Sequence, residues 1–118
     1  MKVRAVVFIA DEFQGGDSEI LTKESLNIKS YMLNPVVLEN YNLFPGPIGK
    51  VTNLTWEGNK LVADIELLPE IGDGFLKSFP AIGYICSSKE LMSIALCNAK
   101  NVDERIKTLE EQMKNGGC

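Results

Sequence analysis

The chain has 118 residues, of which 45% are hydrophobic and 24% charged, and its formal net charge is -4 at pH 7. This length and balance are typical of one globular domain rather than a disordered chain, and an acidic chain without a basic cluster is not expected to bind nucleic acid. The sequence contains no histidine, which excludes the Ser–His, Cys–His and His–metal mechanisms.

The first part of the chain predicts two strands and one helix. The apolar run Lys2–Ile9 predicts a buried strand, and it is too short for a signal peptide, so we expect a cytoplasmic protein. A loop is expected over 11–17, followed by a helix over Leu21–Met32 that ends before a proline. Val36–Leu38 predicts a short buried strand, and the segment 43–49, rich in glycine and proline, predicts a rigid loop.

A β-hairpin is the clearest signal in the chain. Strands are predicted over Lys50–Trp56 and Lys60–Leu68, joined by a tight turn at Glu57–Asn59. In the second strand every second residue is apolar, which is typical of an antiparallel strand that buries one face and exposes the other.

The last part predicts two strands and a helix. A short helix or turn around Phe75–Ser78 precedes strands over Ala81–Ser87 and Leu91–Cys97. A helix is expected to begin at Asn101, which would cap it with Glu104 three positions on. Its apolar stripe, at helical spacing, consists of Val102, Ile106, Leu109 and Met113.

This order of elements predicts an α+β fold with a small, curved antiparallel sheet or barrel and two or three helices. We expect one domain over residues 1–115 and a flexible C-terminal tail over residues 116–118. Cys86 and Cys97 lie in apolar runs and are expected in the core, whereas Cys118 belongs to the tail. The cysteines lack metal-ligand spacing, no motif indicates a cofactor, and no apolar run approaches the roughly 18 residues that a membrane-spanning helix needs.

Five segments occur in a distinctive order in the middle of the chain. They read NPVVLENYN from Asn34, PIGKVTNL from Pro47, GNKLVADIEL from Gly58, FPAIGYI from Phe79 and LMSIALCNAKN from Leu91. Their order and spacing resemble the core of the prohead (head maturation) proteases of tailed bacteriophages. The resemblance covers roughly residues 33–102 and implies the α+β barrel of the herpesvirus assemblins.

The two catalytic positions of that family are not retained. In the family, the first segment leads to a catalytic His, and the strand that FPAIGYI resembles carries the nucleophilic Ser. The match places Asn40, with Tyr41 as the alternative, at the His position and Ala81 at the Ser position. Asn has no nitrogen that takes a proton and Ala has no nucleophilic oxygen, so the resemblance implies a protease scaffold that is inactive as written. Ser87 would lie about 20 Å farther along the strand, at roughly 3.3 Å per residue, and is a poor substitute.

These replacements favour a structural protein of the phage head. The resemblance implies a pseudoenzyme that binds or stabilises the capsid shell as a decoration, cement or scaffold-like subunit, in the host cytoplasm during assembly and in the prohead or virion capsid. Its partners would be the major capsid or scaffold protein and further copies of itself, for which an exposed edge such as Lys2–Ile9 could pair between subunits. No nucleic acid, membrane, metal or cofactor is expected.

Two alternatives stay open. In the first, the protein is a serine-type maturation protease that cleaves capsid or scaffold proteins, and this copy carries His-to-Asn and Ser-to-Ala changes or is trimmed to its core. In the second, the resemblance is accidental and the chain is an unrelated small binding domain, so that Asn40 is a turn former and Ala81 a small core residue.

Overall fold

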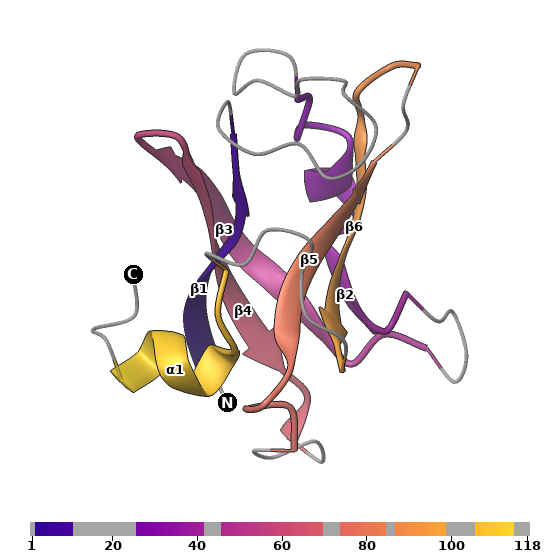
Figure 1. Cartoon of the computed structure of the whole chain (residues 1–118). Coiled ribbons are helices and arrows are strands. Elements are labelled where there is room, and N and C mark those ends of the chain that lie inside the picture. The colour runs from indigo at the N-terminus through magenta and orange to yellow at the C-terminus, as the bar shows by residue number, and fades with distance from the viewer. Residues whose placement is uncertain are drawn as a thin grey trace.

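Six strands form one sheet that curls until it is nearly closed on itself (Figure 1). The computed structural model describes residues 2–10, 26–41, 46–69, 74–84, 87–98 and 106–114. The strands are β1 (Lys2–Ile9), β2 (Val36–Glu39), β3 (Gly49–Glu57), β4 (Lys60–Leu67), β5 (Phe79–Tyr84) and β6 (Leu91–Cys97). Within these residues the helical elements are the 3₁₀ turn η1 (Tyr31–Leu33) and the helix α1 (Leu109–Lys114). The predicted α+β class with a small curved sheet is confirmed.

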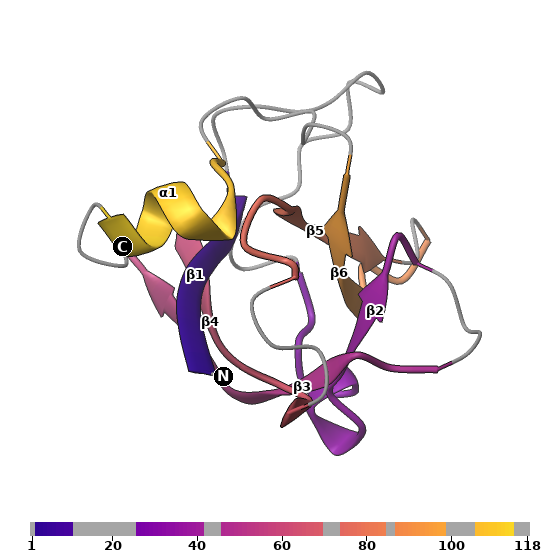
Figure 2. The same ribbon diagram turned by 90° about the horizontal axis from the view of Figure 1, so that it is seen from below.

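The order of hydrogen-bonded neighbours is β1–β4–β3–β2–β6–β5, so β1 and β5 are the two edge strands. Neighbours are antiparallel, as predicted, except for β2 and β6, which are parallel. The three strands between them in the chain provide the long connection that a parallel pair requires. Figure 2 shows the strands standing in a ring in which β1 and β5 approach each other. We call the place where these two edge strands face each other the seam.

The predicted hairpin is confirmed with nearly the expected bounds. β3 and β4 pair up to Glu57 opposite Lys60, and the two-residue turn between them begins at Gly58, whose φ is 63°. A glycine adopts this positive φ without the steric cost of a Cβ, which suits the first position of a tight hairpin turn. The sequence therefore encodes this turn locally.

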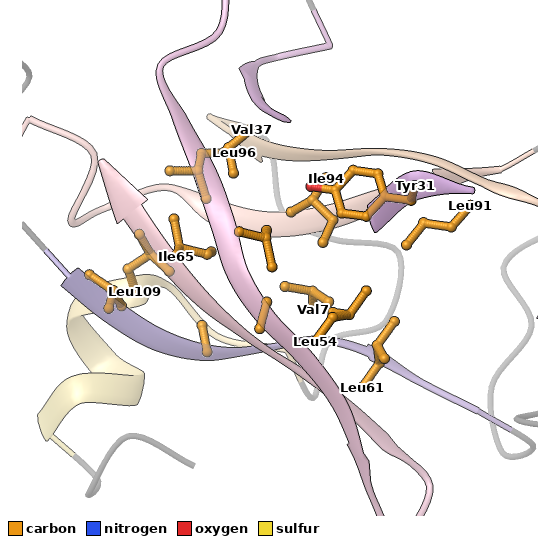
Figure 3. Packing of buried hydrophobic residues seen from close by; sticks show 14 of the residues in the cluster. Val7, Tyr31, Val37, Leu54, Leu61, Ile65, Leu91, Ile94, Leu96 and Leu109 are labelled. Atoms are coloured by element: carbon orange, nitrogen blue, oxygen red, sulfur yellow. The ribbon is translucent and has the colours of Figure 1, made fainter. Parts of the chain in front are cut away.

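The core lies inside the curled sheet. Its side chains come from β1, β2, β3, β4 and β6, from η1 and from α1, and they point toward one another across the interior (Figure 3). The alternating apolar residues predicted for β4 are among them. Members that are at most 1% exposed include Val7, Leu61, Ala63, Ile65, Leu91, Ile94, Leu96 and Leu109.

β4 is buried on both faces around Val62, which corrects the prediction of a strand with one solvated face. The side chain of Val62 is 1% exposed and packs with Val6, Ile9 and Ile106 in a second cluster on the outside of β1 and β4. The covering residue, Ile106, is 44 positions away in sequence. Alternation within one strand carries no information about such a distant neighbour.

The helix predicted over Leu21–Met32 is wrong for its described part, which begins at Leu26. Asn27 forms an isolated bridge with Glu90, and its N–H and C=O bond the main chain of Lys89 and Leu91, each at 2.8 Å. These bonds engage the N–H and C=O groups of Asn27 that would form main-chain hydrogen bonds within a helix. Helical structure is limited here to the 3₁₀ turn η1, and the expected loop over 11–17 and residues 21–25 lie outside the described part.

The last helix begins later than expected. Residues 106–108 are not helical, and α1 begins at Leu109, whereas the predicted cap Asn101 and its partner Glu104 lie outside the described residues. The cap is instead Thr108, whose Oγ1 accepts the N–H of Glu111 at 3.2 Å and donates to the carboxylate of Glu111 at 3.1 Å. Thr108 and Glu111 have the Thr-x-x-Glu spacing of a capping box, with the Glu111 carboxylate accepting the hydroxyl of Thr108 rather than its N–H.

The predicted apolar stripe of this helix holds only in part. Leu109 and Ile106 are buried as expected, but Ile106 precedes the helix, Met113 is 44% exposed, and Val102 lies outside the described residues. The inward face of α1 consists of Leu109, in the core, and the polar side chain of Gln112, which is 8% exposed.

Candidate functional site

The family-equivalent positions lie around three adjacent strands, β2, β6 and β5. Leu38 on β2 stands opposite Ala95 on β6, which stands opposite Ala81 on β5. Their neighbours along each strand, such as Val37 and Ile94, point into the core. Because side chains alternate across a strand, this row points away from the core. We call this side of the sheet the outer face; Leu38 and Ala95 there are nevertheless buried, at 5% and 0% exposed. Its members are Leu38, Tyr41, Ala81, Gly83, Ser93, Ala95 and Cys97.

Asn40 ends β2 and ties it to the end of β6. Its φ of 48° lies in the left-handed region, which asparagine tolerates better than most residues. Its N–H donates to the C=O of Leu96 at 3.1 Å, and its side-chain Oδ1 accepts the N–H of Asn98 at 3.0 Å. At the predicted histidine position, the chain thus has an amide whose oxygen is engaged by the main chain.

Tyr41 reaches from the end of β2 across β6 to β5. Its φ of 63° also lies in the left-handed region. Its hydroxyl donates a hydrogen bond to the C=O of Ile82 at 2.9 Å. The ring lies against Gly83: a Cβ at that position would stand 3.3 Å from Cε1 of Tyr41 and 2.9 Å from Oγ of Ser93. Gly83 therefore makes room for the tyrosine, and the alternative histidine position carries a phenol.

Ala81 is half-buried in β5, at the position predicted for the nucleophile. Two strand spacings of about 4.8 Å separate it from Leu38, the last outer-face residue of β2 before Asn40. Of the five segments, NPVVLENYN, LMSIALCNAKN and FPAIGYI supply the three adjacent strands β2, β6 and β5. The side chains at the positions in question are an amide, a phenol and a methyl group.

Neither titratable side chain of the outer face is a base at neutral pH. Burial, with a smaller contribution from the neighbouring Cys97, raises the pKa of Tyr41 to about 12, although 43% of the residue is exposed. Burial also raises the pKa of the Cys97 thiol. Both groups therefore stay protonated, and no described side chain of this face can accept the proton of the Ser93 hydroxyl. Among the described residues, this face therefore holds no base for proton transfer.

Other residues singled out from the sequence lie elsewhere. Ser87 is exposed in the turn after β5 rather than in the strand, because β5 spans Phe79–Tyr84. Cys97 is half-buried on the outer face, which corrects the expectation of a core residue, because it stands one position beyond the inward-pointing Leu96. Cys86, Cys118 and the predicted tail over residues 116–118 lie outside the described residues.

A shallow hollow lies at the other end of the sheet, where β3 begins and β4 ends. Its volume is about 230 Å³, and its lining includes Pro47, Leu68 and Pro69. Gly49 forms part of the wall, since a Cβ there would stand 2.6 Å from the C=O of Glu66. Lys50 and Glu66 pair across it at 3.8 Å. No sequence pattern predicts this hollow, because its residues come from two segments and share no motif.

Comparison of the chain with protein-family models, curated proteins and solved structures found no match. Among the described residues, no three acidic or cysteine side chains are grouped so that they could hold a metal ion. In the same part of the chain, no helix has the length and apolar character needed to cross a membrane.

Proposed function

We propose that the chain is a head-morphogenesis protein of a tailed bacteriophage, with a prohead-protease fold that is catalytically inactive as written and that binds or stabilises the capsid shell. Its role would be that of a decoration, cement or scaffold-like subunit. The observation that carries the proposal is the state of the two family-equivalent positions: Asn40 has its side-chain oxygen bonded to the N–H of Asn98, and Ala81 has only a methyl group.

The environment of these positions supports a binding role. Tyr41, the alternative to Asn40, is a protonated phenol bonded to the main chain of β5. Ser93 has no base beside it among the described outer-face residues. A hydroxyl without a base is a weak nucleophile, which supports a role other than catalysis for this face. Tyr41, which is 43% exposed, is its residue open to contact with a partner.

The proposed partners are the major capsid or scaffold protein of the same phage and further copies of this chain. The proposed locations are the host cytoplasm during assembly and the prohead or virion capsid afterwards. A net charge of -4 without a basic cluster fits a protein partner better than a nucleic acid.

The alternative proposal is a serine-type maturation protease that carries inactivating changes or is trimmed to its core. The two replacements are conservative in size, since Asn is close to His and Ala differs from Ser by one oxygen atom. Changes of this kind remove catalytic groups while keeping the fold, which favours this alternative. β2 and β5 also flank the same strand, β6, so that restored side chains would belong to one surface.

One experiment separates these functions. The double variant Asn40→His/Ala81→Ser, its counterpart Tyr41→His/Ala81→Ser and each single variant are incubated with the major capsid protein or scaffold region of the same phage, and fragments are identified by mass spectrometry. The unmodified chain is sedimented with assembled shells and, as the control, with unassembled capsid protein. Sedimentation with shells and no cleavage by any variant is expected.

Cleavage that requires both restored residues would support the protease instead. A chain that neither cleaves capsid components nor binds shells would contradict both phage functions and leave the unrelated binding domain. Near-ultraviolet circular dichroism of each variant establishes that it is folded, because Asn40→His removes the bond to Asn98.

A further inference from the structure

The strand β2 is too short to cover the strands on either side of it. It has four residues, whereas its neighbours β3 and β6 have nine and seven, and both extend past the residue at which β2 begins (Figure 1). On the side of β6, Asn27 covers the extension and accepts the N–H of Leu91 at 2.8 Å. On the side of β3, the last main-chain bond in the described part of the chain runs from the N–H of Val51 to the C=O of Pro35, at 2.8 Å.

The register of the β3–β4 hairpin shows which main-chain groups of β3 point away from β4. Glu57 and Lys60 flank the two-residue turn and form a hydrogen-bonded pair, so every second residue back along β3 bonds β4. Thr55 is the next of these, whereas the N–H and C=O groups of Leu54 and Trp56 point to the opposite side. Unlike β1 and β5, which face each other at the seam, these two residues have no described strand paired beside them on that side. Unpaired main-chain groups on a strand edge are a template for pairing with another chain.

The two faces of this part of β3 differ in chemistry. Leu54 belongs to the core and Trp56 packs against it, so residues paired with them would continue an apolar face. On the other face, Glu57 and Asp64 both bond Arg4, which sets one cation against two carboxylates. Because opposite charges that face each other on neighbouring strands are stabilising, a basic residue is favoured opposite Glu57.

We propose that β3 binds an extended segment of another protein as an added antiparallel strand, along an open edge that consists of Leu54, Thr55, Trp56 and Glu57. In the segment, apolar residues alternate with polar ones, and the residue opposite Glu57 is basic. Main-chain bonds to Leu54 and Trp56 provide the affinity, and the alternating side chains provide the selectivity. These groups are unpaired in the folded chain, so no element has to detach. This inference does not rest on the proposed function.

The first test is hydrogen exchange of single amides in the free protein, followed by NMR in reducing buffer. The amides of Thr55 and Glu57, which bond β4, are controls within the same strand. We expect the amides of Leu54 and Trp56 to exchange at least tenfold faster, on the order of unprotected groups. Equal protection of all four amides would show that the open edge is already bonded within the chain, and would overturn the proposal. Protection that rises with protein concentration would assign the edge to a second copy, and would also overturn it.

The second test adds a capped peptide of about eight residues, in which valine alternates with threonine and lysine. Trp56 is the one tryptophan of the chain, so its fluorescence reports binding at the edge. We expect a saturable change in emission, and amides of Leu54 and Trp56 that exchange about tenfold more slowly with the peptide bound. A control peptide that is N-methylated at each valine lacks the donors that face β3 and should not bind. Absence of binding by the first peptide at about 1 mM, or equal binding of both, would overturn the proposal.

The charge preference is tested with Glu57→Gln, which should bind the lysine peptide about threefold more weakly than the parent. Glu110→Gln, the same change in charge on α1, is the matched control and should bind as the parent does. Equal affinity of the two variants would contradict the predicted basic residue opposite Glu57. If Glu57→Gln does not fold, a peptide with glutamate in place of lysine decides on the parent: weaker binding supports the preference, and equal binding contradicts it.

Discussion

Tyr41 shows how one side chain replaces a predicted chemical role with a structural one. Its two-residue left-handed turn with Asn40 directs the ring away from the continuation of β2 and over β6. Left-handed backbone conformations cost of order 1 kcal/mol or more at residues other than glycine. The hydrogen bond to Ile82 and the contact with Gly83 offset that cost, so the turn and its contacts depend on each other.

The burial of Tyr41 predicts a pH dependence at the residue scale. Because the pKa of this phenol rises from 10.0 to about 12 on folding, the folded protein holds the proton more tightly than the unfolded chain. Its contribution to stability is therefore complete below pH 10 and is lost as pH rises toward 12. The free energy of unfolding of Tyr41→Phe should fall less steeply with pH over this range than that of the parent, as measured by urea denaturation. At pH 8 the variant should already be about 1 kcal/mol less stable, because it lacks the bond to Ile82. Parallel pH profiles for the two proteins would contradict the prediction.

The stability of the short helix α1 depends on the contacts at its ends. Its six residues begin at a capping box and include one buried apolar and one buried polar side chain. The hydrogen-bonded turn at Asn27 is a second case in which contacts decide the element, since bonds to Lys89 and Leu91 hold it outside a helix. At Asn27 the distant partners override local propensity, whereas in α1, whose residues LEEQMK are good helix formers, the partners add to it.

The capping box provides the prediction at this scale. Thr108→Ala removes the oxygen that accepts the N–H of Glu111, and should lower the free energy of unfolding by about 1 kcal/mol. Thr108→Ser keeps the oxygen and is the matched control, with a much smaller loss. Both effects are measured by denaturant unfolding, together with hydrogen exchange over residues 109–114. Equal stability of Thr108→Ala and the parent would show that the cap does not hold the helix.

The whole molecule is held together by a core that draws on strands from both halves of the chain and on α1. The parallel β2–β6 pair places residues 37 and 94 side by side, and α1 links the turn before β5 to β1. Such distant contacts favour unfolding in a single cooperative step.

Substitution of Leu109 tests this cooperativity. Leu109→Ala removes a side chain that is 0% exposed and should lower the free energy of unfolding by about 2–5 kcal/mol. Fluorescence of Trp56, in β3, and far-ultraviolet circular dichroism should report the same shifted transition. Met113→Ala, at a residue that is 44% exposed in the same helix, should change stability by no more than about 0.5 kcal/mol. If Trp56 kept its parental transition in Leu109→Ala, the helix and the sheet would be separate cooperative units.

The sequence by itself determined the strands and the hairpin, because alternation of apolar residues and a Gly58 turn are local properties of the chain. It also determined that Asn and Ala stand where the resemblance places His and Ser. Tertiary structure alone decided that Val62 is covered on the outside, that Tyr41 lies over Gly83, and that Gln112 bonds Val6. The physical reason is the same in each case: these residues are partnered by segments 42 or more positions away, and the energy of such contacts exists only once the sheet has curled and brought those segments together.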